Sequence, residues 1–222
     1  VVELAAIAEG GALGSYSFTQ FLGNSKKDQK DPASSINVIS KFADTAQAKA
    51  AAKRAEIIAE QTFLVRDLIN TPPSHLTPDS FCNIMKKHAA KFGVKVEILN
   101  DAALRKGGYG GIIGVGQGSA NPPRLLHVSY NPSKAKKRFA YVGKGITFDT
   151  GGVSLKRPYE TMTAMKSDMA GAAAALATIS ALPALQPQVR VTVLMALAEN
   201  ALSGSAQRPS DVISHYGGTS VE

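Results

Sequence analysis

The stretch that decides the fold runs from Tyr141 to Ala175 and reads YVGKGITFDTGGVSLKRPYETMTAMKSDMAGAAAA. Its first residues are apolar and end a strand that we expect over Arg138–Val142. Its last residues are rich in alanine, and we expect a helix over Asp168–Leu182. Glycine turns and several charged side chains lie between them. Burying charged groups among small and apolar residues costs too much free energy unless they have a functional role.

The charged side chains of this stretch favour a site for divalent metal ions. Lys144 and Asp149 follow the expected strand, and open α/β sheets bind their ligands beyond the carboxyl ends of strands. Taken alone, Asp168 would be a helix N-cap, and Lys144 and Lys156 would be solvated surface lysines. Two carboxylates and two lysines that converge on glycine-rich turns favour metal ions instead. Carboxylates are hard ligands, and a lysine near a dication can lose its proton and coordinate.

The segments that precede this stretch carry clear helix signals. Asp44–Asn70 is alanine-rich, has apolar residues at helical spacing and lacks Gly and Pro, so we expect one long helix that ends before Pro72. Thr77 and Pro78 are typical of a helix start, and Gly93 is typical of a helix end. Asn37–Phe42 alternates apolar and polar residues, which predicts a short strand.

The remaining pattern predicts an α/β fold. A helix is expected from Val2 to a stop at Gly10-Gly11, and the glycine-rich Gly107–Gly118 is expected to form a tight backbone turn. Further strands are expected over Val94–Leu99, Arg124–Tyr130 and Val189–Leu197. The order of these elements predicts a mixed, mainly parallel twisted sheet flanked by helices.

Composition narrows the functional classes. The net charge is +8, from 25 Lys and Arg against 17 Asp and Glu, and much of it sits in basic runs near Lys26 and over Lys134–Arg138. Nucleic-acid binding is possible for such runs but not favoured, because no aromatic residues are interleaved with them; solvated loops explain them better. The single cysteine, Cys82, excludes an internal disulfide framework and a multi-cysteine zinc site. We find no secretory leader and no apolar run of roughly 18 residues, so we expect a cytoplasmic protein without a membrane segment.

Other catalytic patterns are weaker. The histidines are scattered and no HExxH occurs, which argues against a zincin, and no Gly-x-Ser-x-Gly elbow supports a serine hydrolase. Cys82 has no placed base and is expected to be a small core residue. Glu199 and Asn200 follow an expected strand, and we expect them to support the site or the fold from outside.

A resemblance extends over nearly the whole chain. The segments VGKGITFDTGG, SLK and AMKSDMAGAAA resemble the signature of the leucyl aminopeptidase family, the cytosolic dinuclear exopeptidases. Further segments that resemble the family are GALGSYSF, VRDLINTPPSHLTP, GGYGGIIGVGQGSANPPRLLHVSY and LAENALSGSAQRPSDVI.

The resemblance implies a role for each matching residue. Lys144, Asp149 and Asp168 would be ligands of two divalent ions, manganese or zinc, with Asp149 between the two ions. Lys156 would polarise the scissile carbonyl and stabilise the gem-diolate. Met165 would line the pocket for the first side chain of the substrate. The implied reaction is the release of amino-terminal residues, of leucine type, from peptides.

The resemblance also implies a larger protein. Residues 1–45 would be the end of an amino-terminal domain and its linker, and residues 46–222 the first part of the catalytic domain. The family has two more carboxylate ligands, and an arginine that holds a bicarbonate, in an NTDAEGRL segment after the position of Glu222. We therefore expect a chain truncated at both ends, whose isolated 222 residues bind metal weakly and do not turn over. The complete protein is expected to be a homo-hexamer.

Two other readings stay open at the level of sequence. Some members of the family act as architectural or regulatory DNA-binding proteins, and a chain of charge +8 is compatible with that role. A non-catalytic homologue is the other alternative. The intact set of Lys144, Asp149, Lys156 and Asp168 argues against it.

Overall fold

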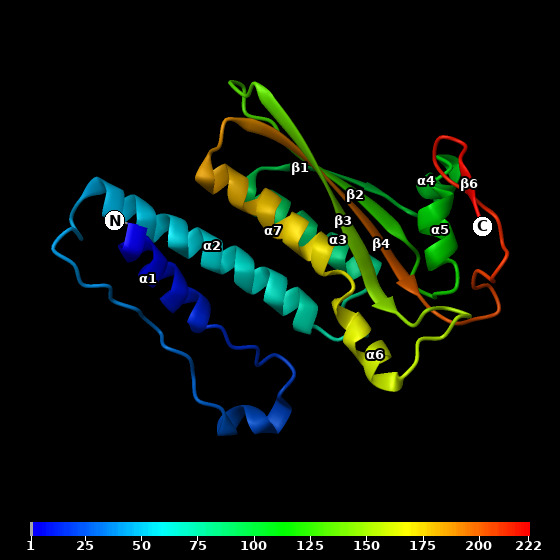
Figure 1. Ribbon diagram of the computed structural model, residues 1–222, viewed down its shortest axis with the longest axis horizontal. Coiled ribbons are helices and arrows are strands. Elements are labelled where there is room, and N and C mark those ends of the chain that lie inside the picture. The colour runs from blue at the N-terminus through cyan, green and yellow to red at the C-terminus, as the bar shows by residue number, and fades with distance from the viewer. Residues whose placement is uncertain (1) are drawn as a thin grey trace. The chain divides into compact units, whose positions relative to one another are not determined.

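The computed structural model describes residues 2–222 (Figure 1). The chain forms two compact units that divide after Asp67. The boundary expected near residue 45 stays a prediction. In the first unit the elements are α1 (Val2–Gly14), the 3-10 turn η1 (Gly23–Asp28) and most of α2 (Ala46–Asn70).

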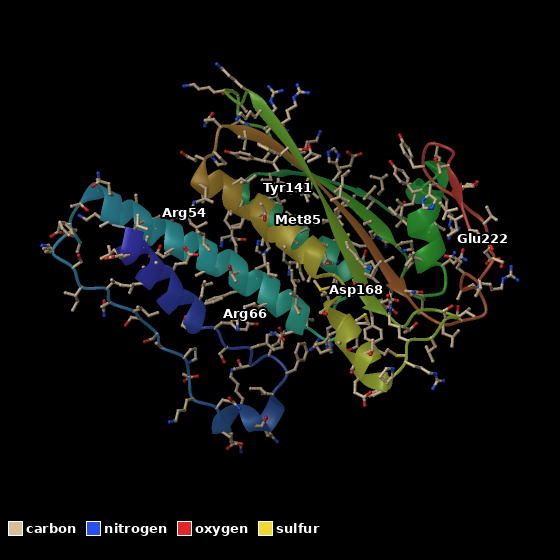
Figure 2. The ribbon with its side chains drawn as sticks, in the orientation of Figure 1. Arg54, Arg66, Met85, Tyr141, Asp168 and Glu222 are labelled. Carbon is tan, nitrogen blue, oxygen red and sulfur yellow. The ribbon has the colours of Figure 1, made fainter. Side chains whose placement is uncertain are left out.

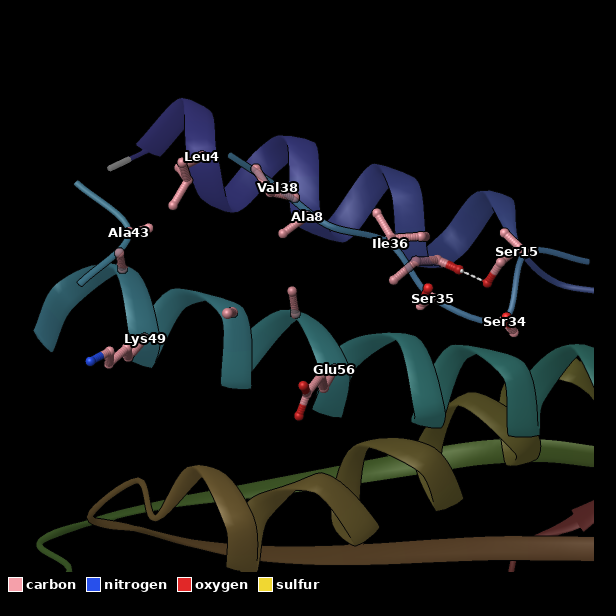
Figure 3. A pocket seen from close by; sticks show the side chains of 15 residues that line it. Leu4, Ala8, Ser15, Ser34, Ser35, Ile36, Val38, Ala43, Lys49 and Glu56 are labelled. Carbon is pink, nitrogen blue, oxygen red and sulfur yellow. Dashed lines mark hydrogen bonds between the residues drawn. The ribbon is translucent and has the colours of Figure 1, made fainter. Parts of the chain in front are cut away.

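The first unit is built on two helices. The helix expected over Asp44–Asn70 is confirmed as α2, and Phe63 on it packs against Tyr16 with ring centroids 5.3 Å apart. Tyr16 also donates a hydrogen bond to Asp67 Oδ1 at 2.8 Å, and the Arg66 guanidinium lies 3.9 Å from the centre of its ring. These contacts tie the segment that follows α1 to the carboxyl-terminal part of α2. Between α1, residues 33–38 and α2 is an apolar hollow of about 400 Å³ (Figure 3).

Two expectations for this unit are wrong. The first helix does not stop at Gly10-Gly11 but continues to Gly14, because a glycine costs a helix only about 1 kcal/mol and does not end it. Asn37–Phe42 is irregular and not a strand. Ile39 is 94% and Phe42 49% exposed, and no strand of the described residues pairs with this segment.

The second unit holds a four-stranded sheet in the order β1-β2-β4-β3. Its strands are β1 (Lys95–Leu99), β2 (Arg124–Tyr130), β3 (Lys137–Asp149) and β4 (Val189–Asn200). The mixed sheet with flanking helices is confirmed. The expectation of a mainly parallel sheet is wrong for these four strands, since β1–β2 and β2–β4 are antiparallel and β3–β4 is parallel. The short strands β5 (Ile213–Ser214) and β6 (Ser220–Val221) form a separate antiparallel pair.

The second unit also contains helical segments, most of which contact this sheet. They are α3 (Pro78–Phe92), α4 (Asp101–Lys106), α5 (Gly110–Gly116), α6 (Tyr159–Ala164), the 3-10 turn η2 (Met165–Ser167) and α7 (Ala170–Leu185). α3 and α7 contact each other and the sheet, and α4 and α5 contact each other and strands of the sheet (Figure 1). The fully buried side chains of these helices and of the sheet include Phe81, Met85, Leu126, Val128, Leu176, Ile179, Val193, Met195 and Leu197.

Local signals explain most of these helices. Thr77 and Ser80 form a reciprocal capping box at the start of α3, and Gly93 ends it in the left-handed conformation with φ of 69°, both as expected. The tight turn expected at Gly107–Gly118 is wrong, because residues 110–116 form α5. There the glycines permit close packing instead: a Cβ on Gly116 would lie 3.0 Å from the Pro123 side chain.

One segment, Tyr159–Leu185, is long and apolar enough for a membrane span by length and composition, although we expected no apolar run of that length. It is interrupted by η2, and α7 buries Ala172, Leu176 and Ile179 completely. Packing against the sheet therefore accounts for its apolar composition.

Candidate metal centre

The site is built where β3 and β4 run side by side to their carboxyl ends. The strand expected to stop at Val142 continues to Asp149, so Lys144 lies within β3 and not beyond it. Lys144 pairs with Ala196 of β4, and Asp149 pairs with Asn200 after an irregularity in register that begins at Ile146. Because the pairing is parallel, the last residues of both strands lie next to each other at the carboxyl-terminal end of the sheet.

Asp149 is held by three donors. Its Oδ1 accepts hydrogen bonds from the Gly151 backbone N–H at 2.8 Å and from Asn200 Nδ2 at 2.7 Å. Its Oδ2 lies 3.1 Å from Lys156 Nζ. Burial by itself would raise the pKa of Asp149, but the Gly151, Lys156 and Asn200 donors together hold that pKa below its ordinary value. Asp149 is therefore an ionised carboxylate in partly buried surroundings.

The turn after Asp149 explains this geometry. The bond from Gly151 N–H to Asp149 is an Asx turn, and Gly152 N–H donates to Thr150 Oγ1 at 3.1 Å in the same manner. Gly151 and Gly152 have φ of 87° and 62°, a region that favours glycine. The backbone N–H of Lys156 donates to the Thr150 carbonyl at 2.9 Å. This hydrogen bond closes the loop and brings Lys156 close to Asp149.

Asp168 forms the second pair. Its Oδ2 lies 3.3 Å from Lys144 Nζ, is shielded from solvent and accepts no hydrogen bond from the described residues. The cap explanation fails, because Met169 occupies the N-cap of α7 and Asp168 follows η2. In Figure 2, Asp168 lies close to the start of α7. A carboxylate oxygen that is buried and not hydrogen-bonded is a suitable ligand for a cation.

Neighbouring residues fix the segment that carries Asp168. Met165 begins η2 and is half-buried, three residues before Asp168. Lys166 donates to the carbonyl of Asn70 at 3.2 Å, at the carboxyl end of α2, where a cation is favoured. The sequence did not indicate this contact, because it joins residues 96 positions apart.

The structure thus brings the four charged candidates into two lysine–carboxylate pairs. Within residues 2–222, no three His, Cys, Asp or Glu side chains lie close enough together to share an ion. The donors are oxygen and amine atoms, and each carboxylate faces a lysine ammonium that already occupies a cation's position. The set of Lys144, Asp149 and Asp168 therefore fits divalent metal ions, with part of the ligand shell to come from elsewhere.

Cys82 has no part in this site. It is buried in α3, and burial, which outweighs the nearby Arg124 cation, raises the pKa of its thiol to about 12. It is a neutral core side chain, as expected from the sequence.

Comparison with known proteins identifies the family. The model of the "cytosol aminopeptidase family, catalytic domain" matches residues 63–222. The chain belongs to the cytosol aminopeptidase family. The four charged candidates, Lys144, Asp149, Lys156 and Asp168, all lie inside the matched catalytic domain.

Relatives in the cytosol aminopeptidase family are similar over the whole chain. The probable cytosol aminopeptidase of Streptomyces avermitilis is 47% identical over 99% of this chain and 43% of its own length. That of Micrococcus luteus is 46% identical, again over 99% of this chain and 43% of its own. The chain therefore spans less than half the length of the curated relatives that it matches.

Three solved structures share the fold of this chain. The bottromycin maturation enzyme BotP in complex with Mn has a TM-score of 0.87 at 37% identity, over 99% of this chain and 44% of BotP. The cytosol aminopeptidase of Coxiella burnetii has a TM-score of 0.84 at 30% identity, over 98% of this chain and 44% of its own. The leucyl aminopeptidase of Trypanosoma brucei, solved with actinonin, has a TM-score of 0.74 at 37% identity, over 77% of this chain and 33% of its own.

Proposed function

We propose that the protein that contains this chain is a metal-dependent aminopeptidase that releases amino-terminal residues from peptides, with a preference for leucine. The observation that carries the proposal is the pairing of Lys144 with Asp168 and of Lys156 with Asp149 at one end of a cytosol aminopeptidase catalytic domain. An aminopeptidase of this kind needs metal ligands and a nearby cationic side chain, and these two pairs would supply them.

Lys144, Asp149 and Asp168 would hold two divalent ions, manganese or zinc. The manganese in the BotP structure supports manganese as the first ion to test. Bound there, such ions lower the pKa of a water molecule and bind the amine and carbonyl of a peptide. A lysine ammonium has no lone pair, so Lys144 can serve only as a neutral amine, and loading its site would release a proton.

Lys156 would be the catalytic lysine. Its backbone N–H is fixed by the Thr150 carbonyl and its ammonium faces Asp149 Oδ2, so its position does not depend on a substrate. A preorganised cation stabilises the negative charge that develops on the carbonyl oxygen in the transition state. The side chain is 30% exposed, which leaves it accessible to a peptide.

Other features of the family complete the proposal. Met165 would line the pocket for the first side chain, because it lies half-buried beside Asp168. A bicarbonate, a homo-hexamer and a cytoplasmic location are proposed from the family, and the cytoplasm also from the names of the relatives. Nothing in the described part of the chain favours DNA binding, so that alternative is not proposed.

The test is hydrolysis of leucine p-nitroanilide by the complete protein with and without added Mn²⁺. We expect metal-dependent activity, and a loss of about 10²–10³-fold in kcat for Lys156→Ala. Lys136→Ala, on the exposed turn between β2 and β3, is the matched control and should keep wild-type activity. Full activity in excess chelator, or a Lys156→Ala variant as active as the control, would refute the proposal.

A further inference from the structure

Asn200, the last residue of β4, makes more contacts with the candidate site than its place in the sequence suggests. Its side-chain Nδ2 donates to Asp149 Oδ1 at 2.7 Å. Its backbone carbonyl accepts two hydrogen bonds from Thr150, from N–H at 3.0 Å and from Oγ1 at 2.8 Å. One residue therefore holds both the carboxylate and the turn that follows it.

The space around Asn200 leaves its amide little freedom. A Cβ on Gly152 would lie 2.9 Å from Asn200 Oδ1, so the glycine there lets the turn close over the amide. The amide oxygen faces the turn while the NH₂ group faces Asp149. The orientation of the side chain is fixed by these two neighbours.

The two carboxylate oxygens of Asp149 have different hydrogen-bond and ion-pair partners. Oδ1 receives two short bonds from neutral donors, the Gly151 N–H and the Asn200 NH₂. Among the described residues, only the Lys156 ammonium faces Oδ2. A cation at Oδ2 would displace an ammonium whose side chain is 30% exposed and which water can hydrate. A cation at Oδ1 would displace the Gly151 and Asn200 donors, for which the described residues show no second acceptor.

We propose that Asn200 is a positioning residue for Asp149: with the Gly151 N–H it fixes Oδ1 and so presents Oδ2 to a divalent cation. This rests on the proposed function for its metal, but the positioning itself exists in the metal-free protein. Hydrogen bonds to a ligating carboxylate commonly change metal affinity by 10- to 100-fold.

The first test measures metal affinity. Asn200→Ala removes the donor and keeps the backbone carbonyl that binds Thr150, and Asn200→Asp keeps the shape but places a second carboxylate against Asp149. We expect the affinity of the complete protein for Mn²⁺, measured by calorimetry, to fall about 10- to 100-fold in both. Asn121→Ala is the matched control, because it removes a similar amide–carboxylate bond, of 2.9 Å to Glu199, outside the pairs. Equal loss in Asn121→Ala, or no loss in Asn200→Ala, would overturn the proposal.

The second test needs no metal. Amide hydrogen exchange of the metal-free protein is followed by mass spectrometry on peptides that span residues 147–156. In Asn200→Ala the Asp149 carboxylate can rotate away from the Gly151 N–H, so exchange in this segment should rise at least several-fold, and Asn121→Ala should leave it unchanged. Unchanged exchange in Asn200→Ala would refute the positioning role. A wild-type protein that binds no Mn²⁺, with exchange altered as expected, would refute the proposed function alone.

Discussion

At Asp149, a partly buried carboxylate keeps its charge because three donors face it, one from β4 and two from the loop after β3. Burial acts against the charge and the donors outweigh it, so the pKa of the folded state lies below that of the unfolded chain. A carboxylate of lowered pKa stabilises the fold above its unfolded pKa, and this contribution is lost as the pH falls through the folded pKa.

This gives a pH prediction for metal-free protein. The difference in thermal stability between wild type and Asp149→Asn should be constant from neutral pH down to about 4, near the ordinary value of 3.8, and should shrink at lower pH. Thermal melts in a pH series measure it. Asp44→Asn is the control, since this fully exposed carboxylate forms only a loose 3.8 Å ion pair. A stability difference that grows on acidification would contradict the prediction.

At the same scale, the sequence pointed to the four charged candidates but not to how they pair. These residues can be recognised in the sequence because their charged side chains lie among glycine and alanine. They are Lys144, Asp149, Lys156 and Asp168. The contact of Asn200 with Asp149 depends on the register of β3 against β4, and that register is a long-range property that spacing within one segment does not contain.

At the scale of elements, close approach of α7 to β3 places Asp168 beside Lys144. Gly143 makes this approach possible, because a Cβ there would lie 2.7 Å from Ala172 Cα and 2.9 Å from the Gly171 carbonyl oxygen. These atoms are backbone and cannot turn aside. The glycine therefore sets the distance between the strand and the start of the helix.

Gly143→Ala should lower the free energy of unfolding by about 1–3 kcal/mol, since the helix must shift to admit the methyl group. Urea unfolding measures the loss. Gly10→Ala in α1 is the matched control: nothing lies within 4 Å of its Cβ position, and it should stabilise by about 0.5–1 kcal/mol. Equal effects of the two substitutions would show that the space at Gly143 is not limiting.

Elements with local start and stop signals were predictable, and those that depend on partners were not. Thr77 and Gly93 bound α3 as their residue types require. Residues 37–42 have the alternation of a strand but no neighbour to pair with, and the glycines of residues 110–116 looked like a turn although packing makes them a helix. The direction of β2 relative to β4 likewise depends on topology, which the sequence pattern does not show. This is why we expected more parallel strand pairs than the sheet contains.

At the scale of the whole molecule, the first unit combines long helices with a long segment that has little regular secondary structure. Residues 23–44 include only the short turn η1, and nearly all of their side chains are exposed. Proteases usually cleave a folded protein first where its backbone is exposed and lacks regular hydrogen bonds.

Limited digestion with trypsin should therefore cut first after Lys26, Lys27, Lys30 or Lys41. The expected result is a stable product that begins within residues 27–42 and keeps α2 and everything after it, identified by intact mass. The basic turn over Lys134–Lys137 is the internal comparison, because it is exposed but is anchored by β2 and β3 on both sides. First cutting in that turn would contradict the prediction.

The bond between Asn200 and Asp149 joins residues 51 positions apart on neighbouring parallel strands. On the ribosome, Asp149 is made first and must wait for β4, which at about 5–20 residues per second takes roughly 3–10 s. During that interval, Gly151 and Lys156 are the only ones of these three partners that have been synthesised. Orientation of the carboxylate is thus delayed until the second strand arrives, and a cation present during synthesis would meet it before its geometry is complete.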